Sequence, residues 1–350
     1  MMLAALLPLA GFCQQMTDDE EHSEYILAVD EFVPAPGQFV NTLPKSEAGD
    51  TPASMARKCT RCLANNKREM VCLGAYGGYI TFHFDHSIVN MPGQRDLFIE
   101  GNAFQSAQYT TMAGGSSEPG IVMVSKDVNQ NGLPDDPWYE LAGSADVDSV
   151  GKVIYNYEIT YTRDEMKDVP WTDNQGNGGV VGRNTYHAQE YYPTWLPASL
   201  TFKGTLLPPN GIDLKGNGRY WFLYFLREGY VDNRPNADRE ANSFDFDWAV
   251  DAERRPVTID FVDFVRVYTA ANQMCGSLGE TSTEIMGAQD LHLDESIAAI
   301  LDATSGIGSA IHSAKATAIF SLDGKCLETP RRGFNLMRMS DGTTKKIIIQ

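Results

Sequence analysis

Apolar and polar residues alternate with a period of two in many short stretches of this chain, which is the pattern of strands that bury one face. In residues 79–85, Ile80, Phe82 and Phe84 share one face and the more polar side chains share the other. Clusters of Gly, Asn, Asp and Pro separate such stretches. Comparable runs lie at residues 25–33, 96–104, 121–125, 138–141, 153–161, 219–226 and 259–268. This pattern predicts an all-β fold, a β-sandwich or jelly roll.

One stretch in the N-terminal half has helical periodicity instead. Thr51 is a suitable N-cap, and proline is favoured at the first position of a helix. Four apolar residues then recur at helical spacing, so that they share one face: Met55, Cys59, Cys62 and Leu63. Cys59 and Cys62 have the spacing of a CxxC motif, but neither a second such pair nor a pair of nearby histidines follows. The sequence predicts a short helix with buried cysteines, with a redox or zinc role as the alternative.

The N-terminal residues predict export. Residues 1–12 form an apolar run of the length of the hydrophobic region of a secretory signal peptide, and we expect the signal peptide to span residues 1–15. Lipidation at Cys13 is an alternative. Residues 16–24 are acidic and are expected to be disordered.

Composition divides the remaining chain into three parts. The sandwich is expected over residues 25–292, and a linker rich in Ser, Ala and Gly over residues 293–314. Residues 315–350 are expected to form a small β tail with Asp-Gly hairpin turns. Its expected strands span residues 317–322, 334–339 and 346–349, and its turns lie at residues 323–324 and 341–342. No stretch after the N-terminus is long and apolar enough to be a transmembrane helix.

A candidate metal loop lies between two of the predicted strands. Oxygen-bearing side chains recur there at short spacing around Gly132, which allows a tight bend, and they are Asp127, Asn129, Asn131, Asp135 and Asp136. Calcium binds six to eight such oxygens. An EF-hand is excluded, because its twelfth position falls on Trp138 instead of Glu. The spacing resembles the short calcium loops of dockerins and thrombospondin type 3 repeats, so we predict Ca²⁺ here, with a merely polar hairpin turn as the alternative.

The net charge and the cysteine content indicate which classes of ligand suit the chain. The formal net charge is −18, with 46 acidic and 28 basic residues, which argues against nucleic acid or an anionic membrane surface as partner. Five cysteines follow the predicted signal peptide, and an odd, widely scattered set is no disulfide framework. Cations and neutral ligands therefore suit the chain better.

Five motifs in order resemble a family of secreted bacterial cell surface proteins with a galactose-binding-like jelly roll. They lie at residues 73–85, 96–104, 118–125, 244–250 and 259–268. The resemblance covers residues 25–292 and implies a surface location more firmly than an activity. Related surface proteins accompany outer-membrane uptake systems for glycans or cobamides, which implies these two ligand classes. The C-terminal pattern of turns resembles the sorting tail of type IX (Por-type) secretion, which implies export and surface attachment.

A segment rich in aromatic residues is the candidate ligand site. Aromatic faces beside amides and acids are what sugar rings bind, and flat surfaces of this kind could also hold a corrin ring. The alternative is that these rings cover the ends of a sandwich. The candidate residues are Trp171, Asp173, Tyr186, His187, Tyr191, Tyr192 and Trp195.

Catalysis has weaker support in the sequence. Asp245 and Asp247 are two residues apart on a predicted strand, so both could face one side, as a glycosidase requires. No nucleophile elbow and no nucleotide-binding fingerprint is present. We therefore predict a secreted, calcium-supported, non-catalytic binding protein for a glycan or a cobamide. The alternatives are a polysaccharide-cleaving hydrolase and a protein-binding surface adhesin.

Overall fold

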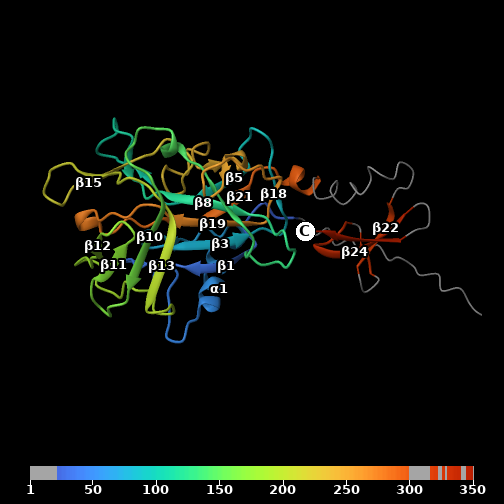
Figure 1. Ribbon diagram of the computed structural model, residues 1–350, viewed down its shortest axis with the longest axis horizontal. Coiled ribbons are helices and arrows are strands. Elements are labelled where there is room, and N and C mark those ends of the chain that lie inside the picture. The colour runs from blue at the N-terminus through green and yellow to red at the C-terminus, as the bar shows by residue number, and fades with distance from the viewer. Residues whose placement is uncertain (1–21, 299–315, 322–324, 328, 340–343, 350) are drawn as a thin grey trace, which may run out of the picture. The chain divides into compact units, whose positions relative to one another are not determined.

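The protein is described from a computed structural model that places residues 22–298, 316–321, 325–327, 329–339 and 344–349 (Figure 1). Residues 23–296 form one compact unit, and the C-terminal strands belong to another. The predicted signal peptide, Cys13 and most of the predicted linker lie outside the described residues. Among the described helices, none has the length and apolar character needed to cross a membrane.

A six-stranded antiparallel sheet forms the centre of the large unit. Its central strands are nearly continuous apolar runs, which are typical of strands that are covered on both faces. The order across the sheet is β1 (Ala28–Val33), β3 (Tyr79–His83), β19 (Phe264–Thr269), β8 (Gly120–Ser125), β9 (Trp138–Leu141) and β17 (Ala249–Val250).

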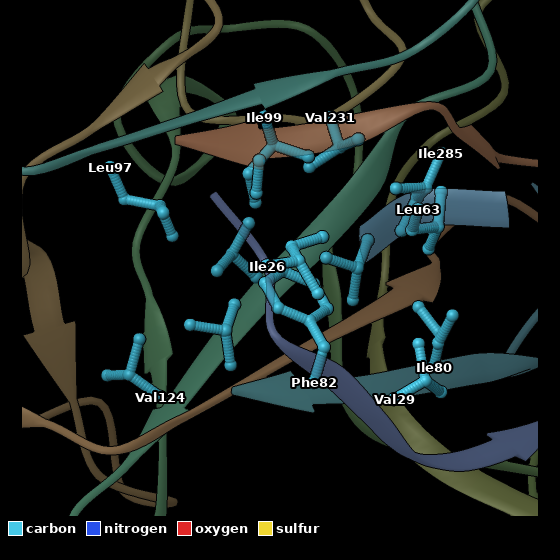
Figure 2. Packing of buried hydrophobic residues seen from close by; sticks show 14 of the residues in the cluster. Ile26, Val29, Leu63, Ile80, Phe82, Leu97, Ile99, Val124, Val231 and Ile285 are labelled. Carbon is cyan, nitrogen blue, oxygen red and sulfur yellow. The ribbon is translucent and has the colours of Figure 1, made fainter. Parts of the chain in front are cut away.

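One face of this sheet packs into the larger hydrophobic core. Ile80, Phe82 and Val124 point into it and meet Leu63 and Ile99 from elements on the other side (Figure 2). The covering elements are α1 (Pro52–Leu63), a three-stranded sheet of β16 (Ser243–Phe244), β5 (Leu97–Glu100) and β21 (Gly287–Asp290), and the pairs β18 (Phe261–Val262) with β4 (Ile88–Val89) and β2 (Val71–Cys72) with β20 (Glu284–Ile285).

The other face packs against a second sheet and forms a second core. Ile121 and Tyr268 from the central sheet meet Ile159, Tyr161 and Phe202. The second sheet has the order β12 (Gly178–Val181), β11 (Val169–Asp173), β10 (Ile154–Thr162) and β13 (Ser199–Leu206). The all-β sandwich predicted from the sequence is confirmed, while its exact jelly-roll topology stays a prediction.

Smaller elements complete the large unit. A fourth sheet has the order β14 (Gly211–Asp213), β15 (Trp221–Tyr224), β7 (Gly114–Ser116) and β6 (Phe104–Gln105). Single turns of 3-10 helix are η1 (Ala64–Asn66), η2 (Ser144–Asp146), η3 (Phe246–Trp248) and η4 (Gly276–Leu278).

Helix α1 begins where the sequence predicts. The Thr51 side chain accepts a hydrogen bond from Ser54 N, and the Ser54 hydroxyl accepts one from Thr51 N, which completes a capping box. Cys59 and Cys62 are buried free thiols on its inner face. Burial raises the pKa of both, that of Cys62 to about 11, so neither is a ready thiolate. The two cysteines serve as packing residues of the core.

The C-terminal unit contains a four-stranded antiparallel sheet close to the predicted strands. Its order is β23 (Cys326–Leu327), β22 (Ala316–Ser321), β24 (Gly333–Met339) and β25 (Thr344–Ile349). The predicted Asp-Gly turns lie outside the described residues.

Candidate functional site

The predicted metal loop joins two neighbouring strands of the central sheet, β8 and β9. At its base, the Asp127 side chain is buried and its two oxygens accept hydrogen bonds from Asn131 N (3.1 Å) and Gly132 N (2.8 Å). Gly132 has a φ of +75°, the left-handed conformation that glycine tolerates best. The bend therefore depends on both the aspartate and the glycine.

The other predicted ligands converge on Asp135. Its carboxylate accepts hydrogen bonds from the amide of Asn129 (2.9 Å) and the amide of Asn131 (3.0 Å), which lower its pKa. The Asp136 carboxylate accepts one from Asn129 N (3.2 Å). All five predicted ligands thus lie in one hydrogen-bonded loop. Three carboxylates and two amides are the oxygen donors that a hard cation such as Ca²⁺ prefers, so the residues fit the ion.

Calcium binding by the loop should be visible in thermal melts. Replacing Asp127 and Asp135 together with alanine is expected to remove the loop's part of the calcium-dependent rise in melting temperature. Calcium at 100 times the Kd of a site stabilises the folded protein by about 2.7 kcal/mol. At roughly 2–4 °C per kcal/mol, this is about 5–10 °C. The comparison is between wild type and variant, each in chelator and in millimolar calcium.

A matched control replaces two surface acids of another loop, Asp164 and Glu165, with alanine, and should keep the full rise. If the loop variant also kept the full rise, the segment would be only a polar turn.

The metal loop leads directly into a cleft at one edge of the sandwich. Trp138, the first residue of β9, donates from its indole N–H to Pro134 O of the loop (3.4 Å). The cleft has a volume of about 130 Å³ and lies between the central sheet and the second sheet. Its lining includes Trp138 and Glu140 from β9, Tyr155 and Asn156 from β10, and Asp251 and Arg254 after β17.

Arg254 holds the charged groups of the cleft together. Its guanidinium forms ion pairs with Glu140 and Asp146, and it lies over the Tyr155 ring at 4.7 Å from the centroid. The second oxygen of Glu140 accepts a hydrogen bond from Tyr268 OH at 3.0 Å. These carboxylates are therefore fixed by protein partners on both sides.

The remaining carboxylate of the cleft is also engaged. Asp251 accepts hydrogen bonds from Arg255 Nε (2.7 Å), Arg255 N (2.9 Å) and Glu253 N (3.0 Å), which keep its pKa low. The cleft thus combines two aromatic rings with polar groups of fixed orientation.

Three of the seven residues that the sequence nominated as a ligand site pack inside the protein. Tyr191 and Tyr192 are fully buried. Tyr192 OH donates to Pro197 O (2.5 Å), and Tyr191 OH accepts from Asn184 N (3.1 Å). Trp195 stacks on Phe32 with centroids 5.9 Å apart. These three rings contact the core, which leaves little of them for a ligand.

The other nominated residues lie nearer the surface, but they do not form one site with the cleft. Trp171 packs against Gly179, and Asp173 caps the β11–β12 turn by accepting from Asn177 N (2.7 Å). His187 lies edge-on to Phe39 with centroids 4.7 Å apart. Tyr186 is 78% exposed.

The acid pair considered for catalysis is not on a strand, which corrects the sequence prediction. Asp245 caps the 3-10 turn η3, and its carboxylate accepts from Asp247 N (2.8 Å). Asp247 accepts from Asn90 Nδ2 and Gly93 N, both at 3.0 Å. The pair caps backbone and joins loops, because the short strand ends at Phe244.

The structure also brings together three carboxylates that the sequence did not nominate as a site. Oxygens of Glu118, Asp232 and Glu284 all lie within 4.8 Å of one another. The residues are 114 and 52 positions apart, since Glu118 precedes β8, Asp232 follows β15 and Glu284 begins β20. No motif or spacing in the sequence connects the three residues.

Comparison with models of known protein families gives no match, and comparison with curated proteins gives none either. The function is therefore argued from the residues of this chain.

Proposed function

We propose that this chain is a calcium-supported, non-catalytic glycan-binding protein of the cell surface, and that the cleft beside Trp138 is its binding site. The observation that carries the proposal is the pairing of the Trp138 and Tyr155 rings with fixed polar groups in one cleft. Aromatic rings bind the apolar C–H face of a sugar, while fixed carboxylate, guanidinium and amide groups pair with its hydroxyls.

The size of the cleft favours a sugar over a cobamide. Its volume of about 130 Å³ is far below the roughly 300–1,000 Å³ of pockets that enclose drug-sized ligands. A single sugar ring at the end or edge of a glycan suits this space, whereas a corrin ring does not.

The carboxylates of the cleft support binding without cleavage. A glycosidase needs one carboxyl group to donate a proton and another to attack or to activate water. Glu140 is held by Arg254 and Tyr268, and Asp251 by Arg255 and backbone N–H groups. Carboxylates held in this way can accept hydrogen bonds from sugar hydroxyls, while both oxygens of each already have protein partners, which leaves neither free to attack a sugar.

The metal loop would support the site by ordering its first residue. Trp138 follows the loop directly and donates to Pro134 O within it. A cation that fixes the loop would thereby fix the indole ring. The surface location and an uptake system as partner rest on the sequence resemblance and on the sorting-type tail.

The proposal is tested by glycan binding of the full chain, first on an array and then by calorimetry with the best ligand. Tyr155→Ala removes one ring of the cleft, and we expect it to weaken binding by about tenfold, or roughly 1.4 kcal/mol. Tyr155 is 39% exposed, so the variant should still fold.

Tyr186→Ala is the matched control, because it removes an exposed tyrosine from the aromatic segment. Loss of binding in this control with retention in Tyr155→Ala would place the site in the aromatic segment. Sugar released from a polysaccharide by the wild-type chain would show a hydrolase, and absence of any glycan ligand would favour an adhesin.

A further inference from the structure

The cluster of Glu118, Asp232 and Glu284 is separate from the metal loop and the cleft. Each residue comes from a different part of the fold, and backbone pairing holds these parts together. Glu118 N donates to Asp232 O, and Gly120 and Val231 exchange two hydrogen bonds, all at 2.9 Å. The carboxylates therefore meet at a junction between the central sheet and its covering loops.

Backbone donors fix the cluster in place. Asp232 accepts hydrogen bonds from Asn102 N (2.6 Å), Ala103 N (2.7 Å) and Glu284 N (2.9 Å). Glu118 accepts one from Ser282 N (3.1 Å). Two of the three carboxylates are thus oriented before any ligand arrives.

No basic side chain balances this charge in the described part of the chain, where none of the three residues forms an ion pair with Lys, Arg or His. Burial raises the pKa of all three, and the neighbouring Glu118 charge adds to the effect at Asp232 and Glu284. Buried like charges are costly unless a cation or protons neutralise them.

Glu280 is a fourth buried acid near the cluster, and one of its carboxylate oxygens has no hydrogen-bond partner among the described residues. Glu280 is only 3% exposed. Its Oε1 accepts from Gln38 N (2.6 Å), while its Oε2 is buried and has no hydrogen-bond partner. Glu280 lies two residues before Ser282, whose N–H donates to Glu118 (3.1 Å), and burial raises the pKa of Glu280 to about 8. A buried carboxylate oxygen without a partner is a place where a bound water or ion is expected.

We propose that Glu118, Asp232 and Glu284, with Glu280 beside them, bind a second divalent cation of the calcium type. Oxygen-only donors favour a hard cation over zinc or copper. Ca²⁺ suits a crowded carboxylate site better than Mg²⁺, which keeps several waters. Glu118 is half-buried, whereas Asp232 and Glu284 are buried. The ion would tie the start of β8 to the loop after β15 and to β20.

Counting bound calcium on the full chain tests this site independently of any glycan. After treatment with chelator, the Asp127→Ala/Asp135→Ala variant is titrated with calcium by calorimetry. We expect it to keep one ion, and adding Glu284→Gln should lower the affinity for that ion by at least about tenfold. Because the substitution removes one of several buried like charges, the protein should melt no earlier in chelator than its parent.

Asp96→Asn is the matched control, since Asp96 is a buried acid that accepts from two backbone N–H groups outside the cluster. It should leave calcium binding unchanged. Should Glu284→Gln fail to fold, Glu118→Gln at the partly exposed edge provides the same test. The proposal is overturned if the loop variant binds no calcium, or if it binds one ion that neither glutamine substitution weakens.

Discussion

Gly78→Ala is expected to leave little folded protein. A Cβ at this position would lie 1.9 Å from Leu73 O and 2.3 Å from Ala35 N, which are joined by a backbone hydrogen bond of 3.0 Å. Both neighbours are backbone atoms, so neither can rotate away as a side chain could. The same segment leads into β3 at the centre of the sheet, and Thr269 N donates to Gly78 O (3.0 Å).

Relieving this clash requires β3 or the 35–37 segment to move. Substitutions that cost more than about 4–5 kcal/mol are exceptional, and this one breaks a buried hydrogen bond as well as forcing the backbone apart. A loss of that size is comparable with the whole stability of an ordinary domain, about 5–15 kcal/mol. Urea unfolding followed by circular dichroism measures it, together with the soluble yield.

Gly182→Ala is the matched control. The nearest atom to a Cβ there is Met274 Cε at 3.7 Å, which is ordinary van der Waals contact. We expect a change within about 1 kcal/mol, slightly stabilising if any, since alanine restricts the unfolded chain. Wild-type-like unfolding of Gly78→Ala would mean that the 73–78 turn is packed differently from the structure described.

The strands with strong alternation were predictable from the sequence, and those with interruptions were not. The predicted run at residues 138–141 matches β9, and the run at residues 79–85 contains β3. β13 was missed although Leu200 and Phe202 alternate inward, because Gly204 and polar neighbours weaken the pattern. Whether such a stretch pairs depends on its neighbours, here β10, which a local pattern does not contain.

The residues of the candidate sites were even harder to predict from the sequence, because their contacts join distant parts of the chain. Alternation places Trp138 and Glu140 on one face of β9, and this much could be predicted. Their partner Arg254 is 114 positions from Glu140, and successive carboxylates of the buried cluster are 114 and 52 positions apart. Spacing along the chain cannot show such contacts, because only the fold creates them.

The abundance of aromatic residues does not by itself show which rings a ligand can reach, for a physical reason. Tyrosine buries a large apolar ring while its hydroxyl needs only one partner, so it serves a core as well as a ligand site. Tyr191 and Tyr192 are buried in the core, whereas Tyr155, which belongs to the predicted run 153–161, lines the cleft. The sequence shows where rings are abundant, and burial decides which of them a ligand can reach.

Arg254→Met is expected to cause the second large loss of stability, because Arg254 neutralises two acidic side chains at the cleft. Side chains of Arg254, Glu140 and Asp146 are 20%, 12% and 18% exposed, so their ion pairs are largely screened from water by protein. Replacing Arg254 alone leaves the carboxylates of Glu140 and Asp146 without their guanidinium partner. Breaking a buried ion pair in this way costs about 3 kcal/mol or more. At roughly 2–4 °C per kcal/mol, Arg254→Met should lower the melting temperature by about 6–12 °C.

The neighbouring residue supplies the control for this prediction. Arg255 also forms two ion pairs, with Asp251 and Glu253, but its side chain is 70% exposed. Exposed pairs of this kind contribute about 0–1 kcal/mol, so Arg255→Met should melt within a few degrees of wild type. Adding Glu140→Gln and Asp146→Asn to Arg254→Met should recover part of the loss, because the uncompensated charges are then gone. Equal destabilisation by the two arginine substitutions would show that burial of the Arg254 pairs does not determine the stability of the cleft.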